Sequence, residues 1–264
     1  MSKKALVVVS FGTSVDIAFP AIANVEETVK KAFPDYDFFR AFTSKMIIRK
    51  LARTKNITIS SPEEVFEQLV EQGYKDVICQ PTHIIPGLEY EKMLDMITPY
   101  KDDFDSLRIG RPLLTTEEDY QAVAHILMDQ ISHPLPADEA YLLMGHGTTH
   151  SADSTYCRME HVLRDLNYDN TFVGTVEGFP DLSYVMQRFR RKDLKKIIMM
   201  PMLIVAGDHA RNDLAGDDED SWKSRLEAAG YETEIILKGL GEIDAIAEVF
   251  ADHARESGPA VFHQ

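Results

Sequence analysis

The chain has little cysteine, a deficit of positive charge and no long apolar run, and each shortage excludes a class of protein. Its 264 residues include two cysteines, too few for the disulfide framework of a small secreted domain. The 43 Asp and Glu residues outnumber 28 Lys and Arg, so the net charge of −15 creates no overall field that attracts nucleic acid or an anionic membrane. No run approaches the roughly 18–20 apolar residues of a membrane span.

The first residues of the chain show no pattern of a signal peptide. Residues 1–4 lead directly into the apolar run 5–9, which turns into a loop at Ser10 to Gly12. This run is shorter than the apolar core of a signal peptide and is typical of a first strand. We therefore expect a cytoplasmic protein without a nucleic-acid or membrane partner.

Short apolar runs alternate with amphipathic stretches along the whole chain. Helix starts are marked by caps, as where Ser61 precedes Pro62. This alternation predicts an α/β fold with mainly parallel sheets flanked by helices. The expected strands are Ala5–Val9, Asp37–Ala41, Asp76–Cys79, Leu107–Ile109, Glu139–Met144, Thr171–Val176, Lys196–Met200 and Thr233–Leu237.

The two halves of the sequence resemble each other. The segment around Phe11 aligns with the segment around His146, and Phe42 aligns with Glu177. The segment from Pro81 to Glu89 aligns with 201–209, so that Glu89 lies opposite His209. We therefore predict two similar lobes, 1–132 and 137–264, with a cleft between them and a boundary where prolines break the helix.

Three residues in the second half follow apolar runs directly or by a few residues. His146, Glu177 and His209 are each separated by roughly 30 residues, the length of one β-α-β unit. Ligands of an open parallel sheet bind outside the carboxyl ends of its strands, so these three side chains are expected to converge. Two imidazoles and one carboxylate suit a divalent first-row metal and leave coordination positions free for chemistry.

At these residues the chain resembles the class II chelatases, and most closely the anaerobic sirohydrochlorin cobaltochelatases of the CbiK type. The resemblance covers essentially the whole length. It rests on five motifs: Ser-Phe-Gly-Thr-Ser at 10–14, Pro-Thr-His-Ile-Ile-Pro-Gly-Leu-Glu-Tyr at 81–90, Gly-His-Gly-Thr at 145–148, Val-Glu-Gly-Phe-Pro at 176–180 and Pro-Met-Leu-Ile-Val-Ala-Gly-Asp-His-Ala at 201–210.

The resemblance implies a two-lobed enzyme that inserts a divalent metal into a tetrapyrrole without ATP. It implies that His146, Glu177 and His209 bind the incoming metal. The substrate metal would be Co²⁺, with Fe²⁺ possible in its place, in the anaerobic cobalamin pathway, and no organic cofactor is expected. Self-association is the common default for such enzymes, and no interface residues are assigned.

The residues also suggest roles in catalysis and in binding the macrocycle. His146 is our candidate proton acceptor, because its glycine neighbours allow a ring to approach closely. Arg53, in the basic stretch Lys45–Lys55, is assigned to the substrate carboxylates. Ser10, Phe11 and Glu89 complete the expected substrate site. Glu89 has an alternative as the cap of a helix at 90–97, and the basic stretch has one as a solvated helix face.

Other functions use the same residues. Iron insertion for sirohaem needs the same ligand set, and a tetrapyrrole or metal carrier would bind without turnover. The Gly145–Thr148 loop also has the form of a phosphate-binding turn. It has no adjacent Lys or Arg, which makes a phosphatase a poorer interpretation.

Overall fold

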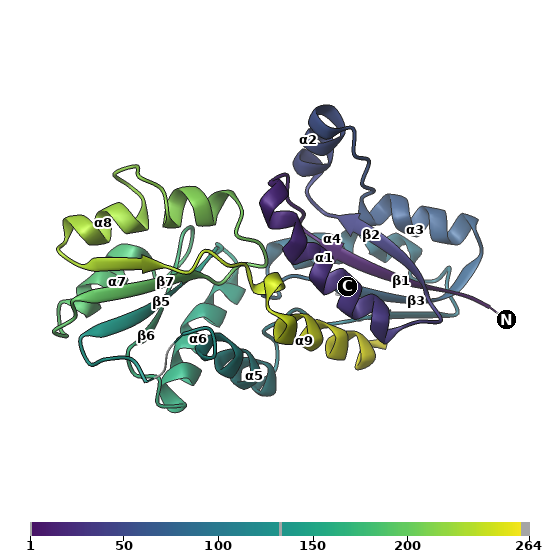
Figure 1. Cartoon of the computed structure of the whole chain (residues 1–264). Coiled ribbons are helices and arrows are strands. Elements are labelled where there is room, and N and C mark those ends of the chain that lie inside the picture. Colours follow the sequence, from purple (N-terminus) through teal and green to yellow (C-terminus); the bar gives the residue numbers. More distant parts are fainter. Residues whose placement is uncertain (1, 132–133, 260–264) are drawn as a thin grey trace. The chain divides into compact units, whose positions relative to one another are not determined.

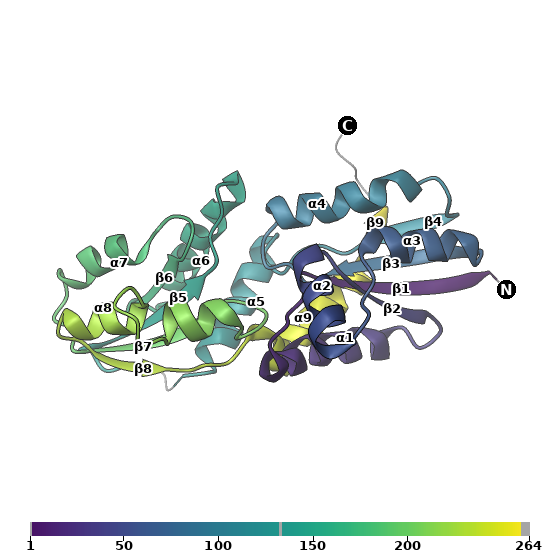
Figure 2. The ribbon, with the colours of Figure 1, turned by 90° about the horizontal axis from the view of Figure 1, so that it is seen from above.

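Two mainly parallel sheets form the cores of the chain's two compact units, and their parallel strands follow the same order. The computed structural model describes residues 2–131 and 134–259 (Figure 1). The chain divides into two compact units: unit 1 is Met1–Thr115 with Gly241–Gln264, and unit 2 is Thr116–Leu240. Each unit has its own sheet and its own covering helices (Figure 2).

The sheet of unit 1 has the order β2-β1-β3-β4-β9. Four of its strands are parallel, and the two-residue β9 pairs antiparallel with β4. The elements are β1 (Lys3–Ser10), α1 (Phe19–Ala32), β2 (Asp37–Phe42), α2 (Lys45–Lys55), α3 (Pro62–Glu71), β3 (Tyr74–Pro81), α4 (Leu88–Ile97), β4 (Ser106–Ile109), α9 (Asp244–Arg255) and β9 (Gly258–Pro259).

Helices bury both faces of this sheet. Every residue of β1 from Ala5 to Val9 is fully buried, as expected of a central strand in a parallel sheet. Ala5, Val7 and Val9 share a core with Phe66 and Leu69 of α3 and Met93 and Ile97 of α4. The α3 helix begins with a capping box, in which Ser61 and Glu64 satisfy each other's backbone N–H groups.

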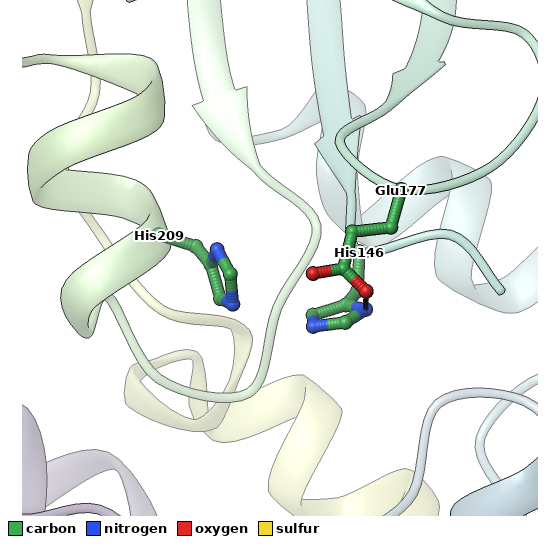
Figure 3. Close-up of side chains that lie close together, drawn as sticks. All are labelled: His146, Glu177 and His209. Atoms are coloured by element: carbon green, nitrogen blue, oxygen red, sulfur yellow. Dashed lines mark ion pairs between the residues drawn. The ribbon is translucent and has the colours of Figure 1, made fainter.

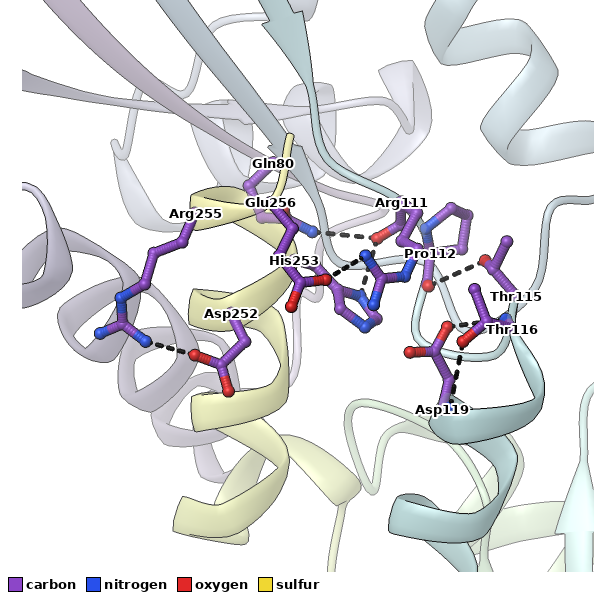
Figure 4. A network of polar contacts seen from close by, with 10 residues as sticks. All are labelled: Gln80, Arg111, Pro112, Thr115, Thr116, Asp119, Asp252, His253, Arg255 and Glu256. Atoms are coloured by element: carbon purple, nitrogen blue, oxygen red, sulfur yellow. Dashed lines mark hydrogen bonds and ion pairs between the residues drawn. The ribbon is translucent and has the colours of Figure 1, made fainter. Parts of the chain in front are cut away.

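The last helix, α9, belongs to unit 1. It packs against α1, and the yellow and purple helices lie side by side in Figures 1 and 2. Polar contacts also hold it there: Arg111 Nη1 donates to Glu256 Oε2 at 2.7 Å, and His253 Nδ1 lies 3.2 Å from the Arg111 carbonyl oxygen (Figure 4). Gln80 Nε2 donates to the same carbonyl oxygen at 3.2 Å.

The compact units therefore divide the chain differently from the predicted lobes, 1–132 and 137–264. Residues from 241 onward return to unit 1, because the apolar face of α9 packs on α1. The helix Glu117–Met128, α5, lies in unit 2, where it packs against α6. The predicted boundary at 132–136 falls partly on residues 132–133, outside the described residues.

The sheet of unit 2 has the order β6-β5-β7-β8, the same as β2-β1-β3-β4. All of its pairings are parallel. The remaining elements are β5 (Glu139–Gly145), α6 (Ser154–Asp165), β6 (Thr171–Thr175), α7 (Leu182–Phe189), β7 (Lys196–Pro201), the π-helical turn η4 (Ala210–Leu214), α8 (Trp222–Ala228) and β8 (Glu232–Ile235).

The α/β fold predicted from the sequence is confirmed. All eight expected strands are present with small shifts at their ends, and the matching strand orders agree with the internal repeat. The strand β9 was not predicted, because two residues carry no periodicity. No helix within the described residues is long and apolar enough to cross a membrane.

Candidate metal centre

The three predicted ligands follow three adjacent strands of unit 2. His146 comes directly after the central strand β5, Glu177 follows β6, and His209 lies beyond β7 at the start of η4. The ladder between β5 and β6 continues past the strand ends, because Val176 N–H donates to the Gly145 carbonyl at 3.1 Å and Glu177 N–H donates to the His146 carbonyl at 2.8 Å. This register brings Glu177 next to His146.

The side chains converge on one space, as Figure 3 shows. One ligand atom from each of His146, Glu177 and His209 lies within 4.8 Å of the other two. The two imidazole centroids are 4.7 Å apart with their planes at 86°. His146 Nδ1 lies 3.9 Å from Glu177 Oε2, and the side chains are 44% and 58% exposed, so a hydrated ion can reach them.

Hydrogen bonds orient both imidazoles. His146 Nδ1 lies 3.0 Å from the Gly147 carbonyl oxygen, and His209 Nδ1 lies 2.6 Å from Asp213 Oδ2. A carbonyl or carboxylate oxygen accepts, so each Nδ1 carries the proton and each Nε2 keeps its lone pair. Metal-binding histidines in proteins typically have this arrangement, in which the second nitrogen donates to a carboxylate or carbonyl.

This donor set can hold a divalent cation. Two neutral nitrogens and one carboxylate suit Co²⁺, Fe²⁺ or Zn²⁺, and three protein ligands leave further positions for water or a substrate nitrogen. Bonds of about 2.0–2.2 Å would require only a modest closing of the three side chains. The open, partly exposed arrangement suits an ion that is passed on more than one that is locked in place.

The residues of unit 1 that were assigned to the substrate differ in exposure. Phe11 is 46% exposed, whereas Phe42 is fully buried, with its ring against Gly12. Of these two aromatic residues, only Phe11 therefore has a ring that a ligand can reach. Ser10 is 2% exposed, and its Oγ accepts from the Thr82 hydroxyl at 2.9 Å. Its contact with the substrate stays a prediction.

Glu89 is not a helix cap. It lies in the first turn of α4, after Gly87 at the N-cap, and forms a 2.6 Å ion pair with Lys92. Both ring nitrogens of the neighbouring His83 are buried, and among the described residues they have no hydrogen-bond partner. Burial lowers the pKa of this imidazole to about 4 despite the opposing effect of Glu89. Sequence reasoning gave His83 no role.

The basic stretch Lys45–Lys55 coincides with helix α2. Lys45 forms an exposed 3.4 Å pair with Glu63, and Lys55 pairs with Asp16 and donates to the Ser14 carbonyl at 2.7 Å. Arg53 is exposed, and within the described residues its guanidinium has no hydrogen bond or ion pair. Its charge is therefore available to an anionic ligand.

Asp213 is a member of the site that sequence reasoning missed. Its spacing of four residues from His209 is the signal that could have found it, because such residues are neighbours on a helix. The turn that carries both is π-helical, a geometry often found at functional sites.

Comparison with known proteins gives relatives across the full length. A family model described as cobalt chelatase (CbiK) matches residues 4–258. The chain is 40% identical over 256 residues to a sirohydrochlorin cobaltochelatase of Salmonella typhimurium, covering 97% of this chain and 96% of that protein. It is 32% identical over 255 residues to sirohydrochlorin cobaltochelatase CbiKC of Nitratidesulfovibrio vulgaris, covering 96% and 90%.

Solved structures share the fold at lower identity. SirB from Bacillus subtilis with Fe³⁺ has a TM-score of 0.65 at 18% identity, covering 96% of this chain and 95% of that one. CbiX, described as the terminal enzyme for siroheme biosynthesis in denitrifying bacteria, has a TM-score of 0.57 at 15% identity, covering 96% and 98%. These likenesses concern the architecture of the chain.

Proposed function

The chain belongs to the cobalt chelatase (CbiK) family, and on this premise we propose that it inserts Co²⁺ into sirohydrochlorin in the anaerobic cobalamin pathway, with His146, Glu177 and His209 as the residues that hold the incoming ion. The observation that carries the proposal is the convergence of these three side chains at adjacent strand ends. Two full-length relatives that bear the name sirohydrochlorin cobaltochelatase support the substrate and the metal.

Metal insertion requires two exchanges. The Co²⁺ ion loses its water ligands, and the macrocycle loses two pyrrolic protons as its nitrogens bind the metal. The Nε2 atoms of His146 and His209 replace water on the ion, and Glu177 offsets part of its positive charge. The protein then releases the ion one bond at a time to the ring nitrogens.

We assign the acceptance of one pyrrolic proton to His146, and the other passes to solvent water. His146 directly follows β5, the strand between β6 and β7, so it lies between Glu177 and His209 along the edge of the sheet. Once the ion has moved to the ring, Nε2 of His146 is free to take a proton, and a neutral imidazole is a competent base at neutral pH. Glu177 at 3.9 Å stabilises the imidazolium that forms.

Four residues outside the metal centre are proposed to bind the macrocycle. Arg53 offers an exposed guanidinium for the substrate carboxylates, and Phe11 offers an exposed ring. Glu89 and Ser10 are further candidates. Each of these four residues is replaced by alanine in turn, and the Michaelis constant for sirohydrochlorin is measured. This tests each assignment separately.

A turnover assay distinguishes the enzyme from a carrier. The native chain is mixed with a large excess of sirohydrochlorin and Co²⁺, and metallation is followed by visible absorption. We expect many product molecules per protein chain, and none above the uncatalysed rate for His146→Ala. Product equal to the protein concentration would show a carrier and would contradict the proposal. His161→Ala, which changes an exposed histidine of α6, is the matched control and should keep full activity.

A further inference from the structure

Two loops of unit 2 must stay together for the metal centre to exist. One follows β5 and carries His146, and the other follows β6 and carries Glu177. Two backbone hydrogen bonds, from Val176 N–H to the Gly145 carbonyl and from Glu177 N–H to the His146 carbonyl, join them beside the ligands. Both bonds lie at the strand ends, so the parts of the loops beyond the ligands need a further contact to stay together.

The carboxylate of Asp153 supplies this contact. Its Oδ1 accepts from the Thr148 N–H at 2.9 Å, two residues beyond His146. Its Oδ2 accepts from the Phe179 N–H at 2.7 Å, two residues beyond Glu177. One half-buried carboxylate at the start of α6 therefore binds the backbone of both loops, each at the same distance in sequence from its ligand.

Two glycines make this contact possible. Gly147 has φ of +82°, a conformation that residues with a side chain rarely adopt, and a Cβ atom there would collide with the backbone of Gly178. A Cβ atom on Gly178 would collide with the Asp153 carboxylate. The loops and the carboxylate thus fit against one another only because both positions lack side chains.

We infer that Asp153 is a positioning residue of the metal centre, which sets the separation of His146 and Glu177 by holding the backbone of both loops. Both of these hydrogen bonds come from backbone N–H groups, so the carboxylate acts through the main chain. The inference rests on the proposed function, because it assumes that these ligands bind Co²⁺. Loss of the carboxylate leaves the N–H groups of Thr148 and Phe179 without their partner and lets the two ligands drift apart.

The test is titration of the protein with Co²⁺ alone, followed by calorimetry and by the visible absorption of the bound ion. We expect Asp153→Ala to bind Co²⁺ about 10–100-fold more weakly, the usual effect of removing a residue that supports metal ligands. Asp153→Asn keeps one acceptor oxygen and should lie between that variant and the native chain. It also serves as the test if the alanine variant does not fold.

Thr116→Ala is the matched control, because Thr116 caps α5 in the same unit and that helix carries none of the three ligands. It should keep native Co²⁺ affinity and the native spectrum. Native-like affinity, within twofold, in both Asp153 variants would overturn the inference. Absence of Co²⁺ binding by the native chain, or equal binding by His146→Ala, would instead overturn the proposed function.

Discussion

His209 Nδ1 lies 2.6 Å from Asp213 Oδ2, four residues further along the same π-helical turn. The carboxylate accepts a hydrogen bond from Nδ1–H, which leaves Nε2 directed toward His146 and Glu177 (Figure 3). It also makes the imidazole a stronger electron donor to a metal. Asp213 therefore fixes both the direction and the strength of one of the three ligands.

Asp213→Ala should weaken Co²⁺ binding about 10–100-fold, because the His209 ring loses the contact that orients it. Titration with Co²⁺ measures this directly. The chain provides a matched control in Asp165, which lies 3.4 Å from His161 Nε2 at the same spacing on the exposed face of α6. Asp165→Ala should leave the affinity unchanged, and an equal loss in both variants would show a general effect of charge.

Arg53→Ala should raise the Michaelis constant for sirohydrochlorin about two- to fivefold with little change in kcat, the effect expected for one exposed charge pair worth about 0.5–1 kcal/mol. The increase should shrink at high salt, since exposed charges are screened. Arg191→Ala removes the same charge from an exposed position in unit 2. An identical change in both variants, or none in Arg53→Ala, would remove Arg53 from the substrate site.

The lowered pKa of His83 predicts that the free energy of unfolding depends on pH. Its pKa is about 4 in the folded chain because burial disfavours the charged ring, against 6.5 for a free side chain. Above pH 6.5 His83 is neutral in both the folded and the unfolded chain, so it adds no pH dependence to the free energy of unfolding. Between pH 6.5 and 4 the unfolded chain binds a proton and the folded chain does not, so stability falls as pH falls, by about 3 kcal/mol in total.

Urea unfolding of native and His83→Leu chains at pH 7, 5.5 and 4.5 measures this contribution. Leucine removes the unpartnered nitrogens at similar volume, so the variant should lose less stability on acidification than the native chain. Parallel pH profiles for the two chains would contradict the account. His161→Leu, at an exposed position, should follow the native profile.

The sequence allowed the strands and the metal centre to be predicted for the same reason. In a parallel sheet covered on both faces, strands are short continuous apolar runs, as in Ala5–Val9, and the residue after each run lies at the edge where ligands bind. Once the runs are assigned to adjacent strands, His146 and Glu177 must approach one another, and the loop after β7 brings His209 to them. Local pattern and topology are sufficient for that step.

Other features depend on contacts that no local pattern encodes. The apolar face of α9 is visible in the sequence, but its partner α1 lies more than 200 residues earlier, so the return of the chain to unit 1 was not predicted. Asp153 acts on backbone N–H groups, which every sequence offers equally. Phe42 aligns with the exposed Glu177, yet its side chain is fully buried and its ring packs against Gly12.

The most direct test of the metal centre is a crystal structure of the protein with Co²⁺, in which anomalous scattering at the cobalt edge locates the ion. The account predicts one strong peak bonded to Nε2 of His146, Nε2 of His209 and a carboxylate oxygen of Glu177, at about 2.0–2.2 Å. Asp213 should still contact Nδ1 of His209. Cobalt bound elsewhere in the chain, with these three side chains free of metal, would contradict it.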